Sequence, residues 1–335
     1  MANIGTTTAF YKVETSLTRA NNEVSKSMER LATGRQNANA GDRSSYVAMA
    51  DTFRLDFVGT KAGIKGASVV MGYLETGMRV LDAASALLSR LQELAVLGAN
   101  QTNTTADADA IDFEAEAIAD EFHRLMTTST YKGKDVFVTT AGSEYVSLGG
   151  RDAEMTFGIG DITYTELYDV SATTTSADTT STRAGRVYKA TSTADFSAAG
   201  GPSSPTSGDT FIATKKATGL TGTQIEEVGN HLIHSPSDGA GAATNTLTED
   251  IEAVQAKINT ARVQAGSQYA ALESAVSFTT DLTAQYELGF NTVNDVNFSM
   301  ETAHLAKNQI LQQAATAMLA QANQGQQGLL QLIQN

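Results

Sequence analysis

Proline is confined to one short window of this 335-residue chain. All three prolines, Pro202, Pro205 and Pro236, lie in the middle, and residues 1–201 and 237–335 contain none. Proline inside a helix removes a backbone hydrogen bond and costs about 3 kcal/mol. The two flanks are therefore free to form long helices, whereas the middle is not.

Both flanks carry apolar residues spaced alternately three and four apart, which is the heptad pattern of helices that wrap around one another. The four stripes run through Leu17, Asn21, Val24, Met28 and Leu31; Leu74, Met78, Leu81, Leu88, Leu91, Ala95 and Gly98; Ile111, Ala115, Ile118, Phe122 and Leu125; and Val254, Ile258, Ala261, Ala265, Leu272, Val276, Thr279, Leu282 and Tyr286. One stripe alone would suit an ordinary helix bundle. Four stripes divided between the two ends predict a mainly α fold, with long N- and C-terminal helices forming a coiled-coil or helical-bundle core.

Turn-forming residues divide the helical flanks. The Gly- and Asn-rich segment 32–45 interrupts the first helix. Segment 98–110 reads as a turn, after which Thr105 or Asp107 would cap the next helix. Segment 144–170 alternates in polarity and carries Gly-Gly and Gly-Asp turns, which predicts one or two β-hairpins.

The middle of the chain, residues 171–245, is rich in Thr, Ser, Gly and Ala. We expect a small β-rich or irregular outer domain there, with complete disorder as the alternative. The Ser/Thr run that opens this segment is also a candidate for O-linked sugars. The candidate acceptors are Thr173, Thr174, Thr175, Ser176, Thr179 and Thr180.

Composition excludes several kinds of function. The formal net charge of −14 argues against a nucleic-acid partner, because phosphate neutralisation needs clustered Lys and Arg. With no cysteine, the chain has neither disulfides nor thiolate sites. The chain contains no stretch of about 18 apolar residues, so we expect no segment that spans a membrane. Its N-terminus lacks the pattern of a cleaved signal peptide.

No arrangement of residues predicts catalysis, a cofactor or a metal site. His231 and His234 share an i, i+3 spacing, but no further good ligand lies near them in the sequence. His123 and His304 are expected on helix surfaces. No phosphate-binding loop, dinucleotide fingerprint or zinc-protease motif occurs, so the chain is not expected to be an enzyme.

The last 28 residues, 308–335, contain no charged residue and no histidine. Ala, Leu, Gln and Met favour a helix, which alone in water would be marginal. We expect this helix to associate with copies of itself, with docking on its own domain as the alternative. Its large apolar side chains are Ile310, Leu311, Met318, Leu319, Leu329, Leu330, Leu332 and Ile333.

Three long segments resemble bacterial flagellin: "SMERLATGRQNANAGDRSSYVAMAD" (27–51), "LSRLQELAVLGANQTNT" (88–104) and "KNQILQQAATAMLAQANQGQQGLLQLIQN" (307–335). The resemblance covers about residues 1–170 and 246–335. It implies an inner coiled-coil domain at 1–45 plus 289–335 that lines a channel. A helical rod domain at 46–170 plus 246–288 would carry β-hairpins, and 171–245 would be a variable, surface-exposed outer domain.

The resemblance also implies function, location and partners. The chain would be exported unfolded by the flagellar type III apparatus and assemble outside the cell into the filament that drives swimming. Its partners would be further copies, an export chaperone, and hook-associated and cap proteins. The expected polymerisation interface comprises Leu17, Val24, Met28, Leu31, Arg90, Leu94, Ile310, Leu311, Met318, Leu319, Leu329, Leu330, Leu332 and Ile333.

An innate immune receptor, Toll-like receptor 5, is a further partner that the resemblance suggests. Arg90, Glu93, Leu94 and Glu114 match its recognition positions, but Ser89 and Leu97 stand where glutamines are common. Two alternatives to a filament subunit stay open. One is the hook–filament junction protein of the same system, and the other is a non-enzymatic coiled-coil adhesin or binding module.

Overall fold

The chain forms two compact units in its computed structural model. Unit 1 comprises residues 1–62 and 278–335, and unit 2 comprises residues 63–277. The described residues are 8–39, 41–149, 153–169, 181–182, 184–193, 196–215, 217–218, 225–228, 231–237 and 246–334. Their helices are α1 (Thr8–Thr33), α2 (Ser44–Gly98), α3 (Thr105–Thr128), α4 (Leu247–Asn294), α5 (Phe298–Gln334) and the short 3-10 helix η1 (Ser197–Ala199). The predicted mainly α fold is confirmed, and the three-part division expected from sequence stays a prediction.

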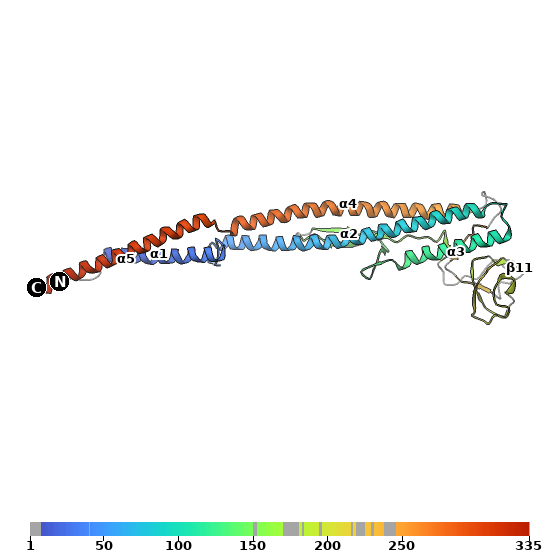
Figure 1. Ribbon diagram of the computed structural model, residues 1–335, viewed down its shortest axis with the longest axis horizontal. Helices are drawn as coiled ribbons and strands as arrows, with labels where there is room; N and C mark the ends of the chain where they lie inside the picture. Colours follow the sequence, from blue (N-terminus) through green and yellow to red (C-terminus); the bar gives the residue numbers. More distant parts are fainter. Residues whose placement is uncertain are drawn as a thin grey trace. The chain divides into compact units, whose positions relative to one another are not determined.

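In unit 1, the terminal helices α1 and α5 lie side by side (Figure 1). The face of α1 that meets α5 follows Leu17, Ala20, Val24, Ser27 and Leu31, the less exposed positions of that helix. The predicted stripe placed Asn21 and Met28 here, but both are exposed. The small side chains of Ala20 and Ser27 occupy the seam instead, because they let the two helices approach closely.

The two non-helical connections of unit 1, between α1 and α2 and between α4 and α5, face each other. The break between α1 and α2 falls within the predicted segment 32–45, but the break between α4 and α5 was not predicted. Backbone hydrogen bonds join them, from Gln36 N–H to Asn294 O (2.7 Å) and from Val296 N–H to Gly34 O (3.1 Å). The Asn297 side chain then accepts from Met300 N–H (3.2 Å), which caps the start of α5.

The remainder of unit 1 pairs the start of α2 with the end of α4. Its interior is partly polar, because the Thr283 hydroxyl donates to the buried Thr60 hydroxyl across 2.9 Å. Phe53 packs against the Tyr286 ring, with 6.5 Å between ring centroids. Next to that pair, Gly289 brings the α4 backbone close to Phe53. These helices therefore share a narrow contact instead of a wide apolar core.

In unit 2, α2, α3 and α4 enclose a continuous apolar core. The fully buried side chains come from all three helices and from the strands that cover them. They include Leu74, Leu81, Leu88, Leu91, Leu94, Ala115, Phe122, Val136, Ile159, Leu167, Val254, Ile258 and Leu272. The predicted stripes at 74–98, 111–125 and 254–276 are confirmed as the source of this core.

The cap expected at the start of α3, Thr105 or Asp107, was wrong by at least one residue. Thr104 is the N-cap residue, and its hydroxyl accepts from Asp107 N–H (3.3 Å). The Asp107 carboxylate accepts in return from Thr104 N–H (3.0 Å), which completes a capping box. Hydrogen bonds from Thr104 lower the pKa of Asp107. Thr105 is instead the first residue of the helix.

Short strands cover the helices of unit 2. Strands β1 (Thr130–Tyr131) and β2 (Lys134–Asp135) form a hairpin whose two-residue loop has positive φ at Lys132 and Gly133. The predicted hairpin within 144–170 is formed by β4 (Glu144–Ser147) and β5 (Glu154–Phe157). Strand β3 (Phe137–Val138) pairs in parallel with β6 (Ile159–Gly160), and β7 (Tyr168–Asp169) pairs with β13 (His231–Leu232).

Glycines in α2 bring this β layer close to the helix. A Cβ atom at Gly63 would lie 2.2 Å from the backbone of Leu148, and one at Gly77 would lie 2.2 Å from Ile159 Cδ1. Glycine inside a helix costs about 1 kcal/mol relative to alanine. The close approach explains why α2 carries glycine at these two positions.

The middle of the chain contributes a small separate cluster. Strands β9 (Val187–Ala190), β10 (Thr210–Ile212) and β12 (Ile225–Glu227) form a three-stranded sheet over Phe196, Ala199 and Ala213. Strands β8 (Ser181–Thr182) and β11 (Ala217–Thr218) pair separately. The expected small sheets in this segment are thus confirmed for the residues described, as against complete disorder. The candidate O-glycosylation acceptors at 173–180 lie outside them.

Two buried acids of α3, Asp112 and Glu116, contact residues of the middle segment 171–245. The Asp112 carboxylate accepts from Ser237 N–H (3.1 Å) and from the Ser237 hydroxyl. One turn later, Glu116 accepts from Leu232 N–H (3.2 Å) and lies 3.9 Å from the Arg186 guanidinium. Burial raises the pKa of Glu116 to about 8, although Arg186 and the Leu232 N–H act in the opposite direction.

Candidate functional site

Unit 1 exposes large apolar side chains along all of its helices. A soluble monomer normally scatters such residues singly, and larger uncovered patches mark association surfaces. Here they recur on α1, on the first part of α2, on the last part of α4 and on α5. They are Tyr11, Met28, Tyr46, Met49, Leu55, Val58, Phe278, Leu288, Phe298, Met300, Ile310, Leu311 and Met318.

The buried apolar residues of unit 1 are few and small by comparison. Among its described residues, they are Ala20, Ala50, Val296 and Ala315. Two packed helices cover only one stripe of each other, so their outer faces stay in water. Unit 1 therefore buries little of its own apolar surface.

Helix α5 shows both faces at once. Its less exposed positions are spaced alternately four and three apart and form the stripe toward α1: Glu301, Leu305, Asn308, Gln312, Ala315, Leu319 and Ala322. Gln312 donates to the Asn21 side chain on α1 (2.7 Å). Away from this stripe lie the exposed side chains of Ile310, Leu311 and Met318. The described helix thus has one covered apolar stripe and one uncovered.

The predicted interface residues fall into three groups. Met28, Ile310, Leu311 and Met318 are exposed, as an interface with other copies would require. Leu17, Val24, Leu31 and Leu319 are half-buried in the seam between α1 and α5. The helix backbone continues through the last group, whose side chains lie outside the description: Leu329, Leu330, Leu332 and Ile333.

Leu94 does not belong with the exposed group. Its side chain is 1% exposed within the core of unit 2, so it stabilises that core and offers no contact surface. Leu94 lies three residues after Leu91 of the predicted stripe and faces the same core. The interface and receptor roles expected of Leu94 stay predictions, which its burial in the single chain does not favour.

Arg90 lies exposed on α2 and joins two carboxylates. Its guanidinium donates to Glu93 (2.7 Å) and to Glu114 on α3 (3.0 Å from Nε). Hydrogen bonds to Glu114, and then to Glu93, raise the pKa of Arg90. The three charged side chains that the resemblance singled out are thus brought together on one surface of unit 2.

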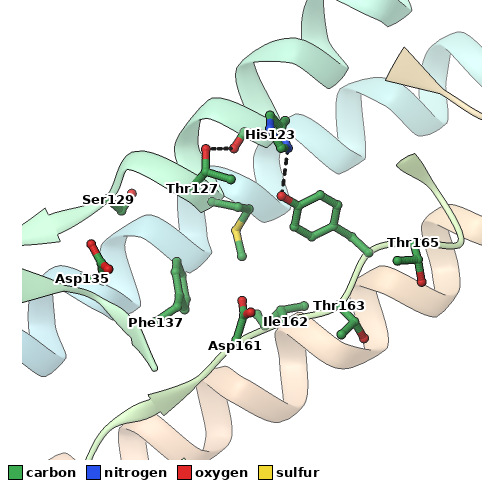
Figure 2. A pocket seen from close by; sticks show the side chains of 11 residues that line it. His123, Thr127, Ser129, Asp135, Phe137, Asp161, Ile162, Thr163 and Thr165 are labelled. Carbon is green, nitrogen blue, oxygen red and sulfur yellow. Dashed lines mark hydrogen bonds between the residues drawn. The ribbon is translucent and has the colours of Figure 1, made fainter. Parts of the chain in front are cut away.

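A pocket of about 390 Å³ opens in unit 2 between α3 and the strands (Figure 2). Met126, Phe137 and Ile162 give it an apolar floor, and Asp135 and Asp161 add carboxylates. At one side, His123 Nδ1 lies 2.9 Å from the Tyr164 hydroxyl. His123 was expected on a helix surface, but it is half-buried in this wall.

The His123–Tyr164 pair is uncharged near neutral pH. Burial lowers the pKa of His123, with Asp120 acting in the opposite direction. Burial, and then Asp161, raises the pKa of Tyr164 to about 12. Both groups are therefore neutral near pH 7 and form a hydrogen-bonded pair in the wall of the pocket.

The remaining histidines form no metal site within the described residues. His234 Nδ1 lies 2.9 Å from Asp250 Oδ2, whereas His231 is in strand β13. His304 is exposed on α5, as expected. In the part of the chain that the structure describes, no three His, Asp or Glu residues are placed to hold a metal ion. None of the described helices combines the length and hydropathy needed to cross a membrane.

The exposed apolar surface of unit 1 is therefore the candidate functional site. Long paired terminal helices with uncovered apolar stripes define the class of helical structural proteins. Two family models agree, because the bacterial flagellin N-terminal helical region matches residues 4–141 and the C-terminal helical region matches residues 248–333. The chain belongs to the bacterial flagellin family.

Known relatives match over nearly the whole chain. The flagellar filament 33 kDa core protein of Treponema phagedenis is 26% identical over 319 residues, which cover 95% of this chain and 94% of that protein. Flagellin A of Vibrio cholerae is 23% identical over 392 aligned positions, which cover 99% of each. The crystal structure of Xanthomonas campestris FlgL is 18% identical, covers 68% of this chain and 98% of its own, and has a TM-score of 0.37.

These matches make the chain a structural protein of the bacterial flagellar filament and not an enzyme. They do not favour the junction-protein alternative or the adhesin alternative. Residues 142–247 lie between the two family models. They contain the three-stranded sheet of β9, β10 and β12 and most of the strands that cover the helices of unit 2.

Proposed function

We propose that this protein self-assembles into the flagellar filament through unit 1. The observation that carries the proposal is the set of large apolar side chains exposed on α1, α2, α4 and α5 of that unit. Burying one such side chain contributes about 1.5–3 kcal/mol before the cost of ordering is subtracted. Further copies of the same chain are the partners that would cover these stripes in a regular polymer.

The absence of charge in residues 308–335 supports the same proposal. In a homopolymer, each α5 helix would meet identical helices, and repeated like charges would repel one another. Gln, Ala and apolar residues avoid that repulsion. The exposed stripe of Ile310, Leu311 and Met318 would then pack against neighbouring copies.

Other parts of the proposal concern export and partners. We propose that the subunit leaves the cell unfolded through the flagellar type III apparatus, and that a chaperone holds its helical ends beforehand. The absence of cysteine suits this route, because no disulfide can form in transit. Hook-associated and cap proteins would adjoin the ends of the extracellular filament.

Receptor recognition and glycosylation also stay proposals. A Toll-like receptor that binds this stretch would contact Arg90, Glu93 and Glu114, because Leu94 is enclosed. O-linked sugars on residues 173–180 would appear as added mass on the intact protein. An intact mass equal to that of the polypeptide alone would contradict glycosylation.

Deleting residues 308–335 tests self-assembly directly. We expect a soluble monomer that forms no filaments in electron micrographs, because the deletion removes most of α5 and its uncovered stripe. Unit 2 should keep its thermal transition, since its core lies within residues 63–277. Normal filaments from the shortened chain would contradict the proposed role of unit 1.

A further inference from the structure

The methionines of the two units differ in exposure. Met28 on α1, Met49 on α2, and Met300 and Met318 on α5 are exposed by 56%, 49%, 58% and 52%, respectively. All four lie in unit 1. The described methionines of unit 2 are buried or half-buried against its core: Met71, Met78, Met126 and Met155.

Methionine is the side chain of this protein that peroxide oxidises most readily. No cysteine competes, because the chain contains none. Hydrogen peroxide transfers one oxygen atom to the thioether sulfur, so that the O–O bond breaks, an S–O bond forms and water leaves. The sulfur loses two electrons and the peroxide gains two, which yields methionine sulfoxide.

Oxidation changes what these side chains can do at an interface. A thioether is flexible and apolar, whereas a sulfoxide is polar and must be hydrated or hydrogen-bonded when it is buried. The four methionines belong to helices that also expose other large apolar side chains, and Met318 lies seven residues after Leu311, on the same side of α5. An oxygen added there would have to be buried whenever the stripe is covered.

We propose that Met28, Met49, Met300 and Met318 form an oxidation-sensitive site that controls assembly of the free subunit. Hydrogen peroxide converts them to sulfoxides while unit 1 is uncovered, and the oxidised subunit is excluded from the polymer. Once the subunit is assembled, neighbouring copies shield the same sulfurs. This inference rests on the proposed function, because it requires unit 1 to be the assembly surface.

The first experiment compares oxidation of monomer and filament. Purified protein is treated with hydrogen peroxide in each state, and peptide mass spectrometry locates every added oxygen atom. In the monomer, the four methionines should oxidise at least several-fold faster than Met71, Met78, Met126 and Met155. In the filament, their oxidation should slow by about tenfold. Equal rates in the two states would overturn the proposed shielding.

The second experiment measures assembly of the oxidised subunit. The monomer concentration at which sedimentable filaments form should rise about tenfold after oxidation, because polar oxygens replace apolar contacts. Methionine sulfoxide reductase should restore the original value. Unchanged assembly by a fully oxidised subunit, with native circular dichroism, would overturn the inference.

A matched pair of variants identifies the sulfurs that matter. The variant Met28→Leu/Met49→Leu/Met300→Leu/Met318→Leu keeps side-chain volume and should assemble equally well before and after peroxide. The control Met71→Leu/Met78→Leu/Met155→Leu in unit 2 should remain as sensitive as the wild type. Equal sensitivity of both variants would overturn the assignment to unit 1.

These outcomes separate the inference from the function on which it rests. If untreated wild-type protein forms no filaments, the proposed function fails, whatever peroxide does. If untreated protein forms filaments and its oxidised form does so equally well, only the oxidation-sensitive site fails.

Discussion

The two units share the long helices α2 and α4 but bury very different interiors. In unit 2, a third helix and a β layer close the space around α2 and α4, and Phe122 and Leu74, Leu81, Leu88, Leu91 and Leu94 are almost wholly enclosed. In unit 1, helices meet only in pairs, and the buried apolar residues are little larger than alanine. A pair of helices becomes stable when further elements cover its apolar stripes. In unit 2, α3 and the short strands of the same chain provide this cover.

The contrast indicates how stability and assembly are divided. Unit 2 can be stable in a single molecule, because its apolar stripes are covered from several sides. Unit 1 has apolar stripes that stay uncovered among its described residues. Substitutions in the two units should therefore affect different measurements, and the following predictions test that separation in order of expected size.

The largest effect is expected from truncation in the core of unit 2. Phe122 is 1% exposed and meets the Tyr164 ring edge-on, with 5.4 Å between centroids. Phe122→Ala should reduce the free energy of unfolding by about 3–5 kcal/mol in denaturant titrations of the monomer.

Leu17→Ala in the α1–α5 seam is the matched test in unit 1. Leu17 is only half-buried, so the same titration should change by less than about 1 kcal/mol, whereas filament formation should weaken. A loss at Leu17 as large as that at Phe122 would show that unit 1 has a closed core, contrary to the comparison.

The second-largest effect is expected from Glu116 in unit 2, which makes the stability of the folded protein depend on pH. Glu116 has a folded pKa of about 8 against an ordinary value of 4.5, because burial disfavours its charge. The folded protein thus retains a proton that the unfolded chain releases. Stability should be greatest below about pH 4.5 and fall as the pH rises toward about 8.

Glu116→Gln removes the titration while keeping a similar shape. The melting temperature of this variant should change less across the same pH window than that of the wild type. Glu121→Gln is the control, because Glu121 is exposed on the same helix and pairs with Arg124. An unchanged slope in Glu116→Gln would assign the pH dependence to another group.

The third effect compares two glycines in helices of unit 2. Gly63→Ala places a Cβ atom 2.2 Å from the Leu148 backbone, so the β layer must shift, at a cost of about 1–3 kcal/mol. Gly266→Ala on α4 meets nothing within 4 Å and should stabilise by about 0.5–1 kcal/mol. If the two substitutions change the melting temperature in opposite directions, the close approach at Gly63 is confirmed. Changes in the same direction would contradict it.

The smallest effect concerns the cap of α3. Thr104→Ala removes the hydroxyl that accepts from Asp107 N–H and should cost about 1 kcal/mol. Thr105→Ala, one residue later, removes no cap and should be close to neutral. If Thr105→Ala proved the more costly in thermal unfolding, the capping box would be misplaced.

Sequence alone predicted the helices because their signals are long and repeated. The absence of proline and the heptad stripes extend over tens of residues, so local errors do not change the result. The break between α1 and α2 was also predictable, since Gly34 and Gly41 stand within it. The short break before α5 was not, because Asp295 and Asn297 are a weak signal inside a long helical pattern.

The site was less predictable than the fold, for a physical reason. A heptad position says that a side chain is covered, but not whether its own chain or another copy covers it. Leu91 and Met28 both fit a stripe, yet Leu91 is enclosed by unit 2 and Met28 is exposed. Tyr11 lies off the predicted stripe of α1, and this was the signal that could have identified it as exposed.

The paired breaks of unit 1 have a mechanical consequence. Within unit 1, the break between α1 and α2 and the break between α4 and α5 lie at the same level, so the paired helices are softest there against bending. The backbone hydrogen bonds of Gln36 and Val296 cross that level, and the Arg35–Asp295 bridge lies between them. Such cross-links resist sliding of one segment past the other. The joint within unit 1 should therefore flex as a single elastic element.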